Sequence, residues 1–111
     1  MKVISWQEFE QVEIRTGTII EVLDFPEAKK PAYRLHIDFG AELGIKKSSA
    51  QITALYTKAS LVGKQIVAVV NFTPKQIGPW MSECLVLGVS SEEGIVLLSL
   101  DQAADNGQKV H

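Results

Sequence analysis

Between Tyr33 and Phe39, apolar and polar residues alternate without a break. The apolar positions begin with the tyrosine and end with the phenylalanine, and each residue between two of them is polar or charged. A period of two predicts a strand with one face against a core and the other toward solvent. This segment has the clearest strand pattern in the chain.

Five further segments predict strands. Residues 14–25 are rich in β-branched side chains and are interrupted by Gly17, which indicates a bend or bulge. A bent first strand suits a small closed barrel, because that strand then serves two sheets. Residues 66–72 are almost continuously apolar and predict a buried central strand. The weaker patterns are residues 45–52, 84–89 and 95–98.

Two short helices complete the predicted elements. Ser5 and Glu8 have the spacing of a capping box, which predicts an N-terminal helix over residues 6–11. A second helix is predicted over residues 53–60, with Thr53 as its N-cap and its end near Gly63. A loop with a proline at each end covers residues 26–31, and Gly40 and Gly44 bracket a turn.

The order of these elements predicts the fold. Short strands separated by turn signals favour a barrel or a sandwich. A short helix after the third strand, followed by more strands, is the order of the oligonucleotide-binding barrel. We therefore expect an all-β fold: a five-stranded barrel of this type with a short N-terminal helix, an inter-strand helix and a C-terminal extension.

Length and composition narrow the class of protein. The 111 residues fit one domain over residues 1–111, with 46% hydrophobic and 22% charged residues. The lone cysteine, Cys84, excludes an intramolecular disulfide framework. The opening MKVISWQEFE turns acidic and aromatic before a signal segment forms, and no apolar run is long enough to insert into a membrane. We expect a cytoplasmic protein.

The sequence shows no pattern typical of catalysis. It has no Gly-rich phosphate loop and no nucleophile elbow, and no nucleophile pairs with a base. The soft or borderline metal ligands are Cys84, His36 and His111, without paired spacing. We therefore expect no enzyme, no cofactor and no metal. Cys84 opens an apolar strand and is interpreted as a buried side chain rather than a nucleophile.

Basic residues fall where a barrel of this type binds its ligand. Its usual ligand face is formed by the second and third strands and the loop before the second. The net charge of −2 excludes binding by bulk charge, so any nucleic-acid site must be a local patch. The alternative interpretation is that the lysines in these segments are ordinary solvated surface charges, and their placement fits it equally well. The residues on the predicted face are Lys29, Lys30, Arg34, Lys46 and Lys47, with Lys75 after the central strand.

Several collinear blocks of the chain resemble CsaA-like proteins of the tRNA-binding domain family. That family includes tRNA-binding proteins and domains appended to some methionyl- and phenylalanyl-tRNA synthetases. The resemblance covers essentially the whole chain and is strongest at Ser48-Ser49-Ala50-Gln51-Ile52 and Val69-Val70-Asn71-Phe72. The other blocks are residues 13–17, 25–28, 31–32, 37–40, 44–46, 82–83 and 85–88.

The resemblance implies a homodimer that binds tRNA. In such dimers the terminal extensions pack across the two-fold axis, which would give Trp6 and Phe9 a partner. The positions that it implies for tRNA contact are Asn71, Lys75 and Ser82. Glu83 departs from the wider family, and a carboxylate there is unfavourable beside a phosphate. The turn after the central strand is an alternative role for Asn71.

The resemblance also implies a second kind of partner. CsaA-like proteins are implicated as chaperones in protein export that bind unfolded polypeptides before export. Pro79, Trp80 and Met81 are predicted to lie in a loop, where an apolar cluster either packs on the core, meets a subunit or binds a ligand. The alternative function is a peptide groove lined by Phe72, Ile77, Trp80 and Met81.

Overall fold

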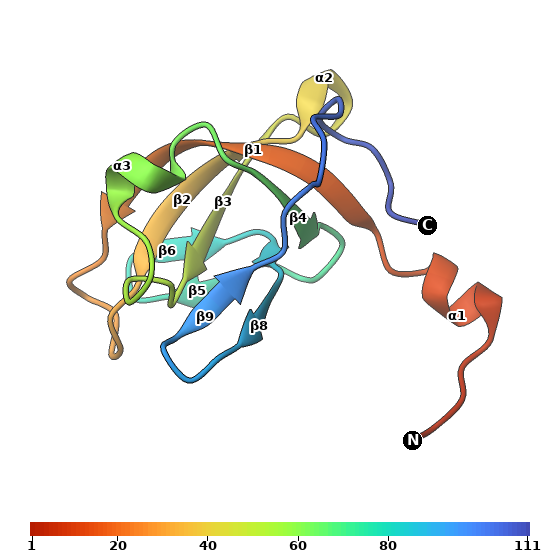
Figure 1. The fold of residues 1–111 in the computed structure, drawn as a ribbon, viewed down its shortest axis with the longest axis horizontal. Helices are drawn as coiled ribbons and strands as arrows, with labels where there is room; N and C mark the ends of the chain where they lie inside the picture. Colours follow the sequence, from red (N-terminus) through yellow and green to blue (C-terminus); the bar gives the residue numbers. More distant parts are fainter.

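A computed structural model describes residues 1–111 and shows one antiparallel sheet of five strands curled into a nearly closed barrel (Figure 1). The order across the sheet is β3-β2-β1-β4-β7. This confirms the predicted all-β, five-stranded barrel. The strands are β1 (Ile14–Asp24), β2 (Tyr33–Asp38), β3 (Ile45–Ala50), β4 (Gln65–Val69) and β7 (Leu85–Val86).

Two small hairpins and three short helices surround the barrel. No helix is long and apolar enough to cross a membrane. The hairpins are β5 (Lys75–Ile77) with β6 (Trp80–Ser82), and β8 (Gly88–Ser90) with β9 (Ile95–Leu97). The helices are α1 (Trp6–Glu10), α2 (Gly40–Leu43) and α3 (Lys58–Leu61).

The long strand β1 belongs to both halves of the barrel. Its first half pairs with β4 and its second half with β2, with a register shift between Ile19 and Glu21. The irregularity therefore lies beyond Gly17, which stays in register opposite Ile66. The glycine is required for close packing instead, because a Cβ there would lie 2.7 Å from Ile37 Cγ2 and 2.8 Å from Phe39 Cδ1.

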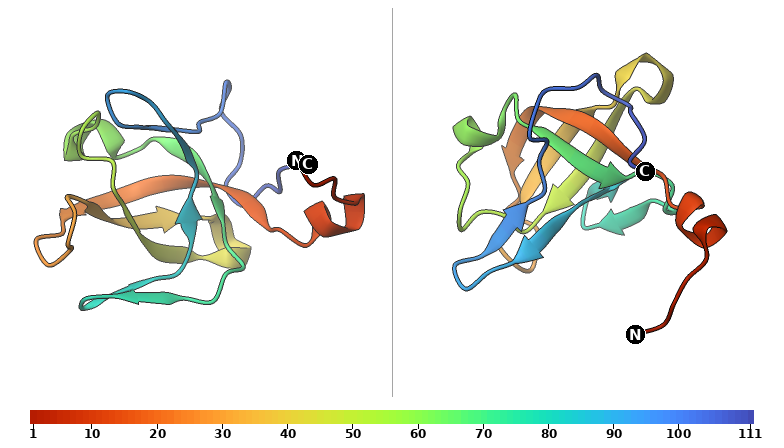
Figure 2. Two further views of the ribbon diagram at one scale, coloured as in Figure 1. Left: turned by 90° about the horizontal axis from the view of Figure 1, so that it is seen from below. Right: turned by 45° about the vertical axis from the view of Figure 1, so that its right-hand side comes forward.

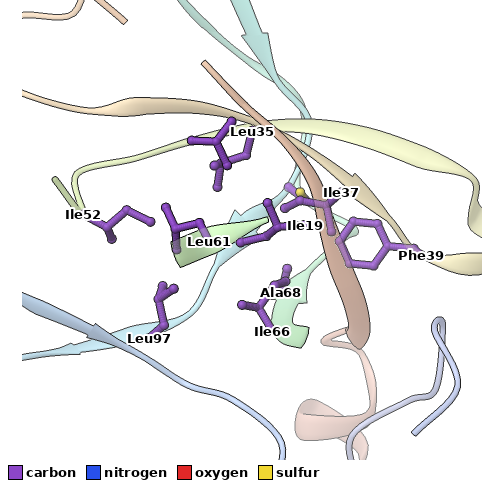
Figure 3. Packing of buried hydrophobic residues seen from close by; sticks show 11 residues of the cluster. Ile19, Leu35, Ile37, Phe39, Ile52, Leu61, Ile66, Ala68 and Leu97 are labelled. Carbon is purple, nitrogen blue, oxygen red and sulfur yellow. The ribbon is translucent and has the colours of Figure 1, made fainter. Parts of the chain in front are cut away.

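The core fills the inside of the barrel with side chains from β1, β2, β4, α3, β9 and the segments between them. Figure 3 shows Ile19 of β1 and Leu35 and Ile37 of β2 pointing into one cluster with Leu61 of α3. Burying each such side chain stabilises the fold by about 1.5–3 kcal/mol. The other members of the cluster are Val22, Phe39, Ile52, Ile66, Ala68, Cys84 and Leu97.

The two edge strands of the sheet meet through a short polar seam. The backbone N–H of Glu83 donates to the carbonyl of Lys47 at 2.7 Å, and the N–H of Lys47 donates to Glu83 Oε1 at 2.8 Å. Ser48, which is fully buried, donates from its hydroxyl to the carbonyl of Cys84 at 2.7 Å. These bonds join β3 to the segment between β6 and β7 and so close the barrel.

The C-terminal tail runs along β1 on the side that β4 leaves open. Thr16 and Gly107 form a backbone hydrogen bond of 2.7 Å, and the N–H of Val110 donates to Ile14 at 2.8 Å. Lys109 donates to Glu13 at 2.8 Å, while Arg15 pairs with the same carboxylate. The hydrogen bond from Lys109, followed by that from Arg15, lowers the pKa of Glu13 below its usual 4.5.

The N-terminal helix is confirmed with the predicted capping box. The Glu8 N–H donates to Ser5 Oγ at 3.1 Å, and the Ser5 N–H donates to Glu8 Oε1 at 2.9 Å. The helix has no buried residue and stands clear of the barrel in Figures 1 and 2. Trp6 is 81% exposed.

The prediction of a helix over residues 53–60 was wrong in its extent and cap. Residues 53–55 form a turn, and α3 begins only after Thr57, whose hydroxyl accepts from the Ser60 N–H. Tyr56 prevents an earlier start, because its carbonyl accepts from Tyr33 and its hydroxyl accepts from the Leu97 N–H. Tertiary contacts thus decide where this helix begins.

Two predicted strands also differ from the structure. The strand expected over residues 66–72 is β4, which ends at Val69, and the N–H of Val70 still donates to the carbonyl of Glu13 at 2.9 Å in the register of the β1–β4 ladder. The strand expected over residues 84–89 is two strands, β7 and β8, since Leu87 joins Val67 of β4 on one side and Leu98 on the other. The remaining predicted strands are confirmed to within two residues. The turn expected between Gly40 and Gly44 is instead the short helix α2, with Gly44 as its C-cap.

The predicted loop around Pro79-Trp80-Met81 was also wrong. Trp80 and Met81 lie in β6, which pairs with β5 across a turn at Gly78. The turn requires a positive φ of 54° at Gly78, a conformation that glycine adopts without steric cost. The hairpin folds back against β3.

The space around Gly17 gives a test of the packing in the barrel. Gly17→Ala should lower the free energy of unfolding by about 1–3 kcal/mol, because the new methyl group overpacks Ile37 and Phe39. Urea unfolding measures this loss. In the background of Phe39→Leu, the added methyl group should lower the free energy of unfolding by less, because the smaller side chain leaves room for it. If the double variant loses the full sum of the two single losses, the packing explanation is wrong.

Candidate nucleic-acid interface

Two grooves lie against the β5–β6 hairpin. The first, the Phe72 groove, has a volume of about 540 Å³, and the second, the Lys29 groove, about 600 Å³. The Phe72 groove is lined by Ser49, Gln51, Phe72, Thr73, Lys75, Ile77, Ser82, Glu83, Cys84 and Leu85. The Lys29 groove is lined by Phe25, Glu27, Ala28, Lys29, Lys30, Ala32, Ser49, Gln51, Lys75, Gln76, Ile77 and Gly78.

The two grooves adjoin along β5. They share the side chains of Lys75 and Ile77 on the hairpin and of Ser49 and Gln51 at the end of β3. The shared wall places the ammonium group of Lys75 between them. A ligand longer than either groove can therefore lie in both and pass Lys75 on the way.

The lysines that line the grooves are free of intramolecular partners. Of the 11 basic residues, six are held by carboxylates, carbonyls or aromatic rings: Arg15, Arg34, Lys47, Lys58, Lys64 and Lys109. Lys29, Lys30 and Lys75 form no hydrogen bond or ion pair, and neither do Lys2 and Lys46. Three of the five uncommitted cations thus line the grooves.

Two of the predicted basic residues lie elsewhere. Lys46 is on β3 but lines neither groove. Arg34 donates from Nε to the carbonyl of Asp24 at 2.9 Å, and its guanidinium lies 5.2 Å from the ring centre of Trp80. Lys47 lies over the same ring at 5.0 Å. Arg34 and Lys47 therefore hold Trp80 by cation–π contact.

Trp80 anchors the hairpin to the barrel. It is only 9% exposed, and its indole N–H donates to the carbonyl of Ser48 at 2.9 Å. The edge of the ring meets His36, with 5.4 Å between ring centres. The predicted peptide-groove residues are accordingly divided: Phe72 and Ile77 line the Phe72 groove, whereas Trp80 and Met81 line neither groove.

Asn71 makes two hydrogen bonds within the molecule through its side-chain amide, one with each end of the group. Its Oδ1 accepts from the Glu13 N–H at 3.0 Å, and its Nδ2 donates to the carbonyl of Gln11 at 2.7 Å. The amide thereby ties the end of β4 to the junction between α1 and β1. The next residue, Phe72, lines the Phe72 groove.

Three consecutive residues, from the last residue of the hairpin onward, have different environments. Ser82 lines the Phe72 groove, with only a long contact of 3.4 Å from its hydroxyl to Cys84. Glu83 also lines it, but its carboxylate accepts from the Lys47 backbone in the polar seam. Burial raises the pKa of the Cys84 thiol to about 11, so the thiol stays protonated at neutral pH and is a poor nucleophile.

Sequence reasoning missed several polar residues of the grooves. Ser49 and Gln51 line both grooves, and their side chains form no hydrogen bond. The signal that could have found them is the polar character of residues 45–52, whose outward face has no core to pack against. No group of three or more His, Cys, Asp or Glu side chains is arranged to hold a metal ion.

The sequence of this domain matches a known protein family. The sequence profile described as "Putative tRNA binding domain" matches residues 14–109, which include every strand of the barrel. The chain is a CsaA-like member of the tRNA-binding domain family. The matched domain begins at β1 and therefore leaves α1 outside it.

The chain resembles solved CsaA structures along its full length. It is 50% identical to the CsaA chaperone protein of Picrophilus torridus, with a TM-score of 0.93 and coverage of 98% of this chain and 100% of that one. It is 46% identical to the chaperone CsaA of Bacillus anthracis, with a TM-score of 0.92 and coverage of 99% and 100%.

The curated relatives are longer proteins. The methionine–tRNA ligase of Bdellovibrio bacteriovorus is 35% identical over 108 residues, and that of Pyrococcus furiosus is 32% identical over 110. These regions cover 96% and 99% of this chain, which spans about 15% of the length of each ligase. The similarity thus concerns one domain of those proteins.

The polar seam gives a prediction for Glu83. Glu83→Ala should lower the free energy of unfolding by about 1–3 kcal/mol, because it leaves the Lys47 N–H without its acceptor. Glu83→Gln keeps an acceptor oxygen and should lose less. Urea unfolding compares the two variants with the parent protein, and an alanine variant of unchanged stability would show that the carboxylate does not contribute to closure.

Proposed function

We propose that this domain binds tRNA, or RNA of similar structure, without catalysis, and that it acts in the cytoplasm. The observation that carries the proposal is the set of free cations, Lys29, Lys30 and Lys75, along two adjoining grooves. Because the chain belongs to a tRNA-binding domain family, tRNA is the ligand that we expect for these cations. Phosphate groups of the RNA would pair with these ammonium groups and release counterions.

The charge balance of the grooves supports an anionic ligand. Only Glu27 and Glu83 oppose the three lysines there, and the seam already engages the carboxylate of Glu83. The local surface is therefore positive although the whole chain carries −2. A neutral or acidic chain can bind nucleic acid in this way if its cations are local and unpaired.

The other predicted residues take different parts in this proposal. Ser82 offers a hydroxyl within the Phe72 groove, and Lys46 adds positive charge on β3 without lining a groove. Arg34 acts through Trp80, since it helps to hold the hairpin whose strand β5 lines both grooves. Asn71 positions the segment that precedes the hairpin.

A salt series tests the role of the lysines. For Lys75→Gln, the slope of log affinity for tRNA against log salt should become shallower by about 0.7–0.9, the value for one lost phosphate contact. The triple variant with Lys29→Gln and Lys30→Gln should lose about three times as much. Fluorescence anisotropy with labelled tRNA measures both.

The control for this series is Lys58→Gln. Lys58 is also a surface lysine, but Asp24 holds it at 2.9 Å and it lies outside the grooves. Its substitution should leave the slope unchanged. An affinity of the parent protein that stays constant from low to moderate salt would overturn the proposal.

We also propose that the domain acts as a homodimer through α1 and the residues before it. Ile4, Trp6 and Phe9 line a hollow of about 220 Å³ with Ser5, and Val3 is 94% exposed. Such an apolar segment, standing away from the barrel, requires a partner to remove it from water. The extensions of CsaA-like dimers make a second copy the partner that we expect.

The oligomeric state gives a direct test. Sedimentation of the parent protein should give twice the chain mass, and Trp6→Ala should shift the equilibrium toward a folded monomer, since α1 contributes no buried residue to its own barrel. Val62→Ala, which trims another exposed apolar side chain at the α3 end, should leave the dimer intact. A monomeric parent protein would contradict this assembly.

A chaperone function is the second candidate. Both solved relatives carry the name of a chaperone, and Phe72 and Ile77 give the Phe72 groove an apolar wall. Unfolded polypeptides, including proteins before export, would then be the ligand. Suppression of aggregation of an unfolded protein, insensitive to salt and weakened by Phe72→Ala, would favour this candidate over RNA.

A further inference from the structure

Phe72 is the most exposed of the four phenylalanines. Phe25 is 4% exposed and Phe39 is fully buried, whereas Phe72 is 57% exposed. The backbone just before it is restrained, because the amide of the neighbouring Asn71 bonds to Gln11 and Glu13. An exposed aromatic ring that lines a groove presents a flat apolar face to a ligand.

The Phe72 groove combines that face with unused polar groups. Ile77 and Leu85 add apolar surface, and Ser49 and Gln51 reach the groove with hydroxyl and amide groups that form no hydrogen bond. A nucleobase has the matching chemistry, with two apolar faces and an edge of donors and acceptors. A carboxamide such as Gln51 can both donate to and accept from that edge.

Lys75 connects this base-like environment to the phosphate-like environment of the other groove. It lines both grooves, and Lys29 and Lys30 line the Lys29 groove beyond it. A base in the Phe72 groove would thus have its phosphate near Lys75, and the following backbone would pass toward Lys29 and Lys30. Only a nucleotide taken out of a duplex stack can expose its face in this way.

We propose that the Phe72 groove binds an unpaired nucleotide, whose base stacks on Phe72 while its backbone runs past Lys75 into the Lys29 groove. This proposal rests on the proposed RNA-binding function and specifies the part of the RNA that is bound. The ligand is a single-stranded segment, such as a loop or an end of a folded RNA, rather than a paired stem.

The test compares the binding of a labelled single-stranded RNA with that of a duplex of the same sequence. A length of about 12 nucleotides is suitable, because one such barrel covers roughly 4–16 nucleotides. The parent protein should bind the single strand more tightly. Phe72→Ala should weaken that binding by about fivefold to 150-fold, the range that corresponds to the loss of one stacked base. Phe72→Tyr keeps the ring and should bind like the parent protein.

Two further variants separate stacking from the other contributions. Phe72→Leu keeps an apolar side chain without a ring and should resemble Phe72→Ala, whereas Val89→Ala, at another exposed apolar position outside both grooves, should have no effect. The loss caused by Phe72→Ala should persist at high salt, where the loss caused by Lys75→Gln becomes smaller.

The contrary outcomes distinguish a failure of the stacking proposal from a failure of the proposed RNA-binding function. If Lys75→Gln weakens binding but Phe72→Leu does not, or if the duplex binds as tightly as the single strand, the stacking proposal is wrong and RNA binding stands. If no RNA binds in a salt-dependent manner, the proposed function fails as well. Binding of unfolded polypeptide that Phe72→Leu preserves and Phe72→Ala weakens would assign the groove to an apolar peptide and overturn the nucleotide.

Discussion

The hydrogen bonds between Lys47, Ser48 and the segment around Glu83 are the constraint on which the rest of this barrel depends. They join the two edge strands of a curled sheet, whose backbone groups would otherwise face solvent or another chain. The same short stretch of β3 receives the indole N–H of Trp80. Closure of the barrel and attachment of the β5–β6 hairpin therefore use neighbouring peptide groups, and both grooves owe their shape to this arrangement.

The polar side chains near the grooves fall into two groups, those that make contacts within the molecule and those that make none. Arg34 and Lys47 support Trp80, and Asn71 holds the end of β4, so these side chains stabilise the frame. Lys29 and Lys75 form no such contact within the molecule and line the grooves instead. A ligand that meets the uncommitted groups does not have to break internal contacts first, which keeps the cost of binding low.

Local patterns account for the part of the structure that the sequence could predict. The alternation over residues 33–39 and the capping box at Ser5 depend on near neighbours, and both appear as expected. The hairpin was missed because three-residue strands carry too little pattern, and the burial of Trp80 depends on Arg34 and Lys47, far away in the chain. The bonds of Asn71 likewise reach back 60 residues to Gln11, so no local signal reveals them.

The C-terminal tail has a consequence for how the chain acquires its structure. Thr16 lies near the beginning of the sequence, yet its backbone partners are Gly107 and Gln108, near the end. Synthesis runs from the N-terminus, so β1 and most of the barrel exist before the segment that pairs with this part of β1. Contacts between such distant residues slow folding, because a long loop must close before they form. The growing chain therefore has an unpaired edge along the first half of β1 until residues 107–110 have been made, and this pairing is the last along β1 to form.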